Sequence, residues 1–141
     1  MSIRQITKHL SLGLVLITWF IFFIRTISGR YFYFLDDLKI IYYPLEVLYA
    51  AAQANFTLPV WSNLLGFGQP VIAWGQLGFF TPLHVLLRAL RIHPITLLQI
   101  SVISYFLVGT VSMFAFLRFR RLSPAAAALG AIVFAFSGFM I

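Results

Sequence analysis

Long apolar segments separated by short polar stretches dominate the pattern along this chain. One apolar run lies near the N-terminus, and two follow one another in the second half. The hydrocarbon core of a bilayer is about 30 Å thick, and a helix needs about 20 apolar residues to cross it. The pattern therefore predicts an all-α integral membrane protein with three transmembrane helices, over residues of about 6–28, 94–117 and 124–141.

The first of these helices extends the apolar run Leu10–Ile24 at both ends, and we expect Arg25 to snorkel toward the far interface. A cleaved signal peptide is the alternative, since a basic start precedes the run and Thr26-Ile27-Ser28 is a weak cleavage site. The bulky Trp19 and the phenylalanines near it disfavour cleavage. We therefore favour an uncleaved anchor.

The interval of about residues 29–93 is predicted to form a long loop on the outer side of the membrane. Its first part, residues 30–43, is an aromatic band interrupted by charge, which is typical of the membrane interface. Pro44 is suited to the first turn of a helix. The apolar residues that follow recur at helical spacing, with Glu46 and Gln53 facing elsewhere; they are Leu45, Leu48, Tyr49 and Ala52.

That spacing predicts a short amphipathic helix, which either lies on the membrane or packs on other helices of the protein. A second amphipathic helix, suited to lying in the membrane interface, is predicted over residues 83–92, with a leucine stripe and a basic stripe. The leucines are Leu83, Leu86, Leu87 and Leu90, and the basic residues are His84, Arg88 and Arg91. We expect these cations to face phosphates, either of bulk lipid headgroups or of a lipid-linked substrate.

The stretch between the two helices, residues 56–82, is rich in glycine and proline and is not predicted to be regular. Non-helical backbone at membrane depth needs protein or a wet cavity to satisfy its polar groups. Long ordered loops of this kind are more often functional than not. The interval is therefore a candidate for part of a site.

Composition supports the membrane class, because 62% of the residues are hydrophobic and 9% are charged. The net charge of +7 does not indicate nucleic-acid binding, since the cations sit mainly at the ends of apolar runs. Arg4, Lys8 and the Arg118–Arg121 cluster predict a multi-pass cell-membrane protein with a cytoplasmic N-terminus. The absence of cysteine excludes disulfides and thiolate metal sites.

An ionisable pair near a membrane is costly, which makes Asp36 and Asp37 candidates for function. As sequence neighbours they point in different directions on a helix or a strand, so both cannot address one atom. One is predicted to face a site while the other caps a helix or helps to hold a metal ion. The alternative is that the pair merely caps a helix beginning near Leu38.

The order of several short segments resembles the first outer loop of YfhO-like membrane proteins, which belong to the GT-C superfamily of polytopic glycosyltransferases. The end of the chain, 130–140, is similar to the third-helix region of that family. Ser62-Asn63 departs from the family pattern, in which Asn-Pro is common. The resembling segments are Asp37, Tyr42-Tyr43-Pro44, Leu58-Pro59-Val60-Trp61, Gly66-Phe67-Gly68-Gln69-Pro70, Gln76 and Thr81-Pro82-Leu83.

The resemblance implies that the chain is the N-terminal part of a single polytopic domain, inactive by itself. The complete enzyme would move a sugar from a polyprenyl-phosphate donor to an acceptor on the outer face of the membrane. Asp37 matches the residue that acts as general base, or as ligand of a divalent cation where one is used, and Asp36 is the additional carboxylate. The residues assigned to substrate binding are Arg88, Arg91, Trp61, Gln76 and Tyr43.

Physical chemistry is compatible with these roles. An ionised aspartate can take the proton of an acceptor hydroxyl. Arg88, Arg91 or a metal ion can stabilise the charge that the leaving polyprenyl phosphate gains. Trp61 and Trp74 could stack on sugar faces. Two alternatives stay open: a non-enzymatic transport or assembly subunit whose acidic loop binds a partner, and a small three-span protein, which the lack of a polar anchor after Ile141 disfavours.

Overall fold

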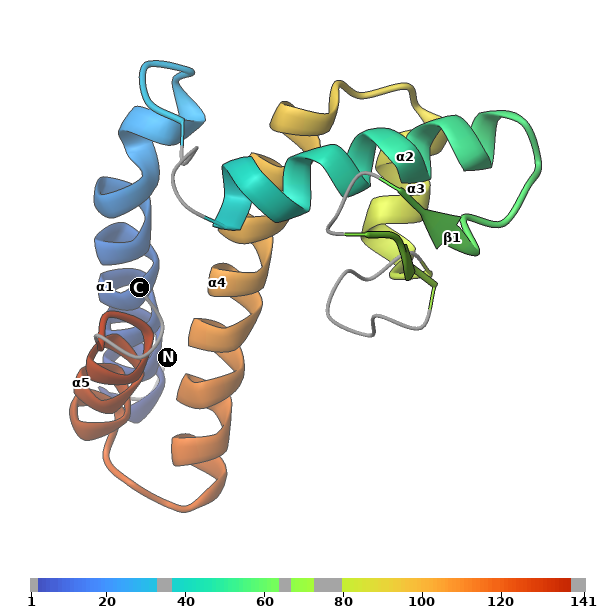
Figure 1. The fold of residues 1–141 in the computed structure, drawn as a ribbon. Coiled ribbons are helices and arrows are strands. Elements are labelled where there is room, and N and C mark those ends of the chain that lie inside the picture. The colour runs from blue at the N-terminus through green and yellow to red at the C-terminus, as the bar shows by residue number, and fades with distance from the viewer. Residues whose placement is uncertain (1–2, 33–36, 64–66, 73–79, 138–141) are drawn as a thin grey trace. The chain divides into compact units, whose positions relative to one another are not determined.

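A computed structural model describes residues 3–32, 37–63, 67–72 and 80–137 (Figure 1). The chain forms two compact units, one of Met1–Tyr31 with Ile103–Ile141 and the other of Phe32–Val102. The elements in chain order are α1 (Ile3–Ile27), η1 (Leu38–Tyr42), α2 (Tyr43–Ala54), β1 (Trp61–Ser62), β2 (Gln69–Pro70), α3 (Pro82–Ala89), α4 (Pro94–Phe119) and α5 (Pro124–Ala135).

Two helices are long and apolar enough to cross a membrane, judged by length and composition: α1 over His9–Ile27, and α4 over Pro94–Phe119. In the most apolar stretch of each helix, only 11% of the residues in α1 and 17% in α4 are buried, whereas the core helix of a soluble protein is mostly buried. The mostly helical fold is thus consistent with the predicted all-α membrane protein.

The third predicted span differs from the expectation. Helix α5 has 12 residues, which corresponds to about 18 Å of helix. Its start agrees with the sequence, because the Ser123 hydroxyl accepts a hydrogen bond from the Ala126 amide and Pro124 occupies the first turn. Residues 138–141 lie outside the described part of the chain, so three spans are not shown.

Small side chains let α5 pack closely within its unit. Ala127 and Ala131 are fully buried in a cluster with Val15 of α1 and Phe114 of α4. At Gly130, a Cβ atom would lie 2.6 Å from the Leu117 side chain, which is closer than a van der Waals contact allows. Close approach through small residues is the usual basis of helix packing in membranes.

Helices α1 to α4 end in the same hydrogen-bond pattern. At the end of α3, the Arg91 amide donates to the Arg88 carbonyl and the Ile92 amide donates to the Leu87 carbonyl. This is a Schellman motif, whose C′ residue adopts a left-handed conformation. The four C′ residues are Gly29, Phe56, Arg91 and Arg121. Only α1 therefore uses glycine for the left-handed conformation.

The second unit begins with a helix that changes its pitch before a proline. The Tyr43 amide donates to the Leu38 carbonyl, a spacing of five residues that defines a π-helical turn. Pro44 has no amide hydrogen to donate, and in a regular α-helix its ring would crowd the carbonyl of residue 40. The wider π-helical turn lets the helix continue past Pro44. Pro44 lies in the first turn of α2, as predicted, but the backbone before it is already helical in η1, so Pro44 does not open the helix.

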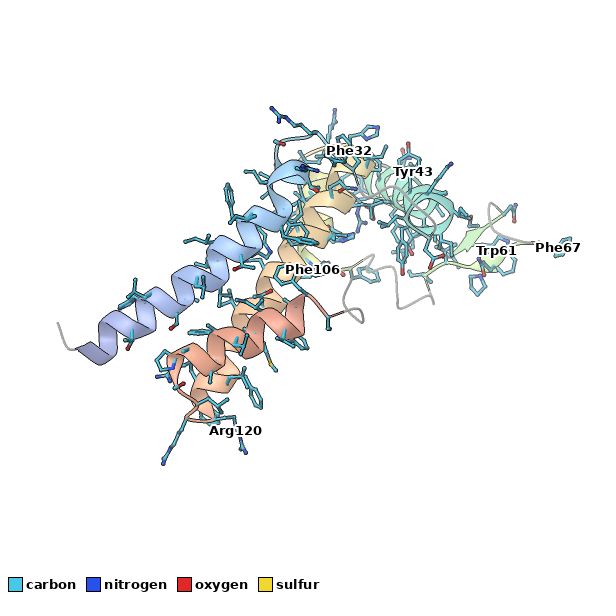
Figure 2. All side chains as sticks on the ribbon, turned by 90° about the vertical axis from the view of Figure 1, so that its left-hand side faces the viewer. Phe32, Tyr43, Trp61, Phe67, Phe106 and Arg120 are labelled. Carbon is cyan, nitrogen blue, oxygen red and sulfur yellow. The ribbon has the colours of Figure 1, made fainter. Side chains whose placement is uncertain are left out.

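Beyond α2, the described residues of the stretch 56–81 have little regular structure, as predicted. The exception in the described part is a minimal antiparallel ladder that pairs Trp61 with Pro70. Val71 follows this ladder and is buried against Leu45 and Tyr49 of α2, which forms the small core of the unit. Figure 2 shows Phe67 projecting away from the hairpin, and its side chain is fully exposed.

The alanine seam in the first unit predicts the effect of overpacking. Ala127→Leu adds atoms where the native side chain has no exposed surface, so we expect the unfolding free energy to fall by about 1–3 kcal/mol. Unfolding in mild detergent with increasing SDS, followed by circular dichroism, measures it. Ala125→Leu makes the same change at an exposed position of α5 and should have little effect. Equal effects of the two substitutions would contradict this packing.

Candidate functional site

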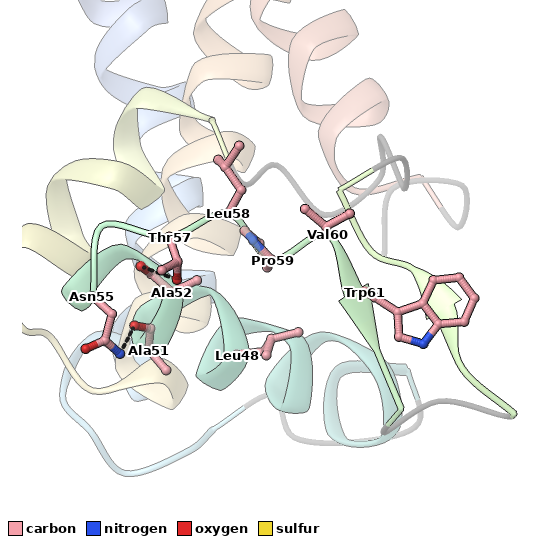
Figure 3. A pocket seen from close by; sticks show the side chains of 9 residues that line it. All are labelled: Leu48, Ala51, Ala52, Asn55, Thr57, Leu58, Pro59, Val60 and Trp61. Atoms are coloured by element: carbon pink, nitrogen blue, oxygen red, sulfur yellow. Dashed lines mark hydrogen bonds between the residues drawn. The ribbon is translucent and has the colours of Figure 1, made fainter.

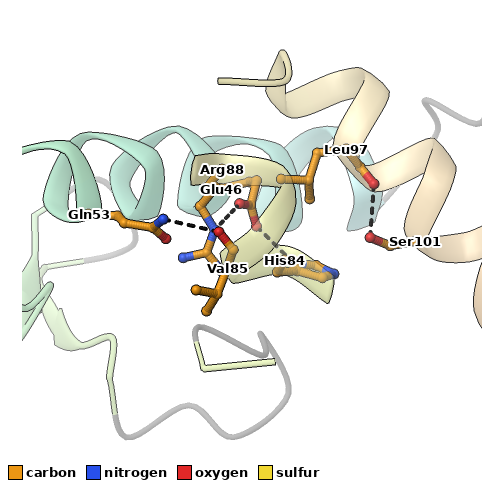
Figure 4. Close-up of polar contacts among 7 residues, drawn as sticks. All are labelled: Glu46, Gln53, His84, Val85, Arg88, Leu97 and Ser101. Carbon is orange, nitrogen blue, oxygen red and sulfur yellow. Dashed lines mark hydrogen bonds and ion pairs between the residues drawn. The ribbon is translucent and has the colours of Figure 1, made fainter. Parts of the chain in front are cut away.

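The main polar cluster in the described part of the second unit joins α2 to α3 (Figure 4). One carboxylate oxygen of Glu46, Oε1, lies 2.8 Å from Nε of Arg88. The other, Oε2, lies 3.2 Å from Nδ1 of His84. The Glu46 and Arg88 side chains are 3% and 1% exposed, so this ion pair is made out of contact with solvent. A single carboxylate therefore holds two basic side chains that lie one helical turn apart on α3.

The geometry also assigns hydrogen-bond roles. A carboxylate only accepts hydrogen bonds, so we assign a proton to Nδ1 of His84. The Arg88 guanidinium carbon lies 5.5 Å from the centre of the Tyr49 ring, within range of a cation–π interaction. The Tyr49 hydroxyl lies 3.4 Å from the carbonyl oxygen of Val71, to which it donates. Through Tyr49, the cluster reaches the small apolar core.

Burial shifts the pKa values of two members of the cluster. It raises the pKa of Tyr49 to about 12, and the Glu46 carboxylate acts in the same direction while Arg88 opposes it. Burial lowers the pKa of Arg88, and Glu46 and Tyr49 partly offset this. Both shifts have the same origin, because removing a group from water disfavours its charged form.

The structure corrects the expected orientation of both helices. Leu45, Tyr49 and Ala52 lie on one face of α2, as their spacing predicted, and this face is buried. Glu46 is buried with them and does not face elsewhere. Of the two readings of this helix, the structure shows packing on another helix of the protein, α3. On α3, His84 and Arg88 lie on the buried face, where the sequence predicted cations turned outward to phosphates.

A second polar contact ties the same two helices. The Gln53 side-chain amide donates to the Val85 carbonyl at 3.1 Å, about two turns after Glu46 along α2. Sequence reasoning did not connect Glu46 with α3. The available signal was the spacing of His84 and Arg88, which one carboxylate on a facing helix can bridge. The missing information was which face of α3 is turned inward.

Among the sequence-predicted site residues, Asp37 lies at the start of the η1 turn and is exposed. A helix does begin at Leu38, as the alternative interpretation of the aspartate pair required. However, the Asp37 side chain makes no capping hydrogen bond, so the capping role considered for it is not seen. Asp36 and Gln76 lie outside the described residues, and so does Trp74.

The other predicted residues occupy different places on the unit. Arg91 is exposed at the end of α3, and Tyr43 is half-buried at the start of α2. Trp61 is exposed on the hairpin, where Nε1 of its indole donates to the side-chain oxygen of Asn63 at 2.8 Å. Its ring lies against Gly68, where an added Cβ would be 2.7 Å from Nε1. Contacts on both sides thus fix the indole of Trp61, but the structure does not gather these residues into one cluster.

A groove of about 360 Å³ runs between the second half of α2 and the extended residues after it (Figure 3). Its lining combines apolar side chains with the amide of Asn55 and the hydroxyl of Thr57. Both polar groups donate to carbonyls of α2, at Ala51 and Ala52, and retain oxygen lone pairs. The full lining is Leu48, Ala51, Ala52, Asn55, Thr57, Leu58, Pro59, Val60 and Trp61.

Metal ligands do not gather in the part of the chain that the structure describes. No group of at least three histidine, cysteine, aspartate or glutamate side chains lies close enough there to hold an ion. A divalent cation at Asp37 would need ligands from elsewhere or from a substrate. The dependence on such a cation stays a prediction.

Comparisons with known proteins give no independent guide. No family model matches the sequence, and no curated protein or solved structure is significantly similar to it.

The buried cluster predicts a large effect for one substitution. Glu46→Ala leaves Arg88 buried without its carboxylate, so we expect the second unit to lose about 3–5 kcal/mol of stability. Hydrogen exchange of the α3 amides measures this loss. Arg91→Ala removes an exposed cation of the same segment and should change exchange little. Protection of α3 that survives Glu46→Ala would show that the ion pair does not hold the helix.

The raised pKa of Tyr49 predicts that the stability of the second unit depends on pH in the alkaline range. Its folded pKa of about 12 exceeds the unfolded value of 10, so the folded state keeps its proton longer. The stability from the protonated hydroxyl is complete below pH 10 and is lost as the pH rises from 10 through 12. An absorbance titration of phenolate at 295 nm should show a late component that Tyr49→Phe removes. A titration unchanged by this substitution would contradict the prediction.

Proposed function

We propose that this chain is the N-terminal part of a GT-C-type membrane glycosyltransferase. The complete enzyme would transfer a sugar from a polyprenyl-phosphate donor to an acceptor on the outer face of the cytoplasmic membrane. Asp37 would act as general base, or as ligand of a divalent cation. In this orientation the N-terminus and the loop between α4 and α5 would face the cytoplasm. This loop carries Arg121 and also Arg120, which Figure 2 labels.

The observation that carries the proposal is the state of Asp37. This carboxylate is exposed and makes no capping bond with the helix that starts beside it. Glu46, by contrast, is already engaged by two basic side chains. Of the carboxylates described in the sequence between α1 and α4, Asp37 is therefore the one that is available to an acceptor hydroxyl. A base needs only such access and hydrogen-bond reach to the proton that it removes.

Arg91 would bind the phosphate of the donor. Its guanidinium is exposed at the end of α3, only a short connection before the apolar helix α4 begins at Pro94. A polyprenyl tail in the bilayer presents its phosphate at headgroup level, where such a residue would stabilise the charge of the leaving group. Arg88 could contribute only by exchanging its contact with Glu46.

Sugar recognition would use the groove beside α2. Pyranose rings offer both hydroxyls and an apolar face, and mixed linings with a few placed polar groups suit such ligands. The Trp61 indole is held by Asn63 and Gly68, so little side-chain freedom would be lost when a ring stacks on it. Tyr43 and Gln76 would complete the substrate-binding residues.

The decisive test is Asp37→Asn in the complete protein. The amide keeps the size of the side chain but is not a base, so we expect sugar transfer to fall by at least about 100-fold, the scale of general-base catalysis. Transfer from a radiolabelled polyprenyl-phosphate sugar in membrane vesicles measures it, and protein in the membrane fraction shows whether insertion is intact.

Asp36→Asn is the matched control and should retain most of the transfer activity. Full activity of Asp37→Asn would remove this residue from the mechanism. The alternative function, a transport or assembly subunit whose acidic loop binds a partner, predicts no donor turnover at all. In that case Asp37→Asn would weaken co-purification with the partner.

A further inference from the structure

Helix α3 has the opposite orientation from a surface helix of a protein in water, because its basic side chains face inward and its outer face is apolar. Its buried residues include His84 and Arg88, with Leu87 between them. Its exposed face carries no polar side chain. The exposed residues, which recur at helical spacing, are Pro82, Val85, Leu86, Ala89 and Leu90.

The exposed area on this face is large. Leu86 is 56% exposed and Leu90 is 63% exposed. An amphipathic helix in water normally turns its apolar stripe to the core and its charges outward. Burying an ion pair also costs desolvation energy that the pairing only partly returns. The arrangement of α3 makes physical sense where its outer face meets an apolar environment.

The chain itself places such an environment within reach. Only residues 91–93 separate Leu90 from Pro94, where the apolar helix α4 begins. A connection of this length spans at most about 14 Å, so the end of α3 stays close to the point where α4 would enter the bilayer. The exposed cation Arg91 occupies this connection, as expected at headgroup level.

We propose that the exposed apolar face of α3 lies in the boundary between headgroups and acyl chains of the membrane. Leu86 and Leu90 insert into the acyl region, and Glu46 neutralises Arg88 on the opposite face of the helix. The ion pair then removes a charge that would otherwise oppose insertion. This inference concerns lipid contact and does not depend on the proposed sugar transfer.

The 141 residues of this chain contain no cysteine. Any cysteine elsewhere in the complete protein is first replaced by serine, so that single introduced cysteines can be labelled selectively. In the complete protein, Leu86→Cys and Leu90→Cys would carry the fluorophore NBD after reconstitution into vesicles of phosphatidylethanolamine and phosphatidylglycerol. Quenching by lipids with a doxyl group high on the acyl chain is compared with quenching by aqueous iodide. Leu87→Cys, on the buried face of the same helix, is the matched control.

We expect lipid-borne doxyl to quench both outer positions several-fold more than iodide does, while position 87 is shielded from both quenchers. Stronger quenching by iodide at 86 and 90 would place the face in water and overturn the proposal. Shielding of 86 and 90 equal to that of 87 would mean that protein covers the face, which also overturns it. Leu90 lies beyond the last helical residue, so Leu90→Cys decides the question if Leu86→Cys does not fold.

Discussion

The contact between Glu46 and Arg88 is made with both side chains almost completely removed from solvent. A charge in such a place is tolerated only with a partner of opposite sign, because desolvation otherwise costs several kcal/mol. His84 and Tyr49 extend the contact, so that one carboxylate organises side chains from two helices. Which face of α3 is turned inward, and where α2 packs, depend on this carboxylate.

That arrangement also decides which groups stay available for chemistry. Arg88 and His84 were attractive ligands for a phosphate, yet they serve the interior of the Phe32–Val102 unit. Asp37 and Arg91 remain exposed, one at the start of the η1 turn and the other beyond the end of α3. The proposed glycosyl transfer therefore places its base and its phosphate ligand on side chains that the packing of the unit does not use.

The unit formed by the two ends of the chain is held together on a different principle. Its described core contains alanine, valine and phenylalanine side chains without a charged partner. Lipid tails are as apolar as leucine, so helices in a bilayer gain from close van der Waals contact and not from hiding apolar surface. Ala127 and Ala131 supply that contact by being small.

The sequence by itself determined the two long apolar helices and several helix starts, because apolar run length and proline position are local properties. It predicted the starts of α4 and α5 at Pro94 and Pro124 as the structure has them. It also marked Asp37 as the residue before a helix, although not the π-helical turn that carries the chain through Pro44.

Only the tertiary structure decided which face of α3 is buried. A helix with one leucine stripe and one basic stripe has two possible orientations, and in water the leucines would face inward. Here Glu46, distant in sequence, offers a partner for His84 and Arg88, and this long-range pairing reverses the choice. Periodicity describes a single helix, whereas the inward face depends on the charge of the helix packed against it.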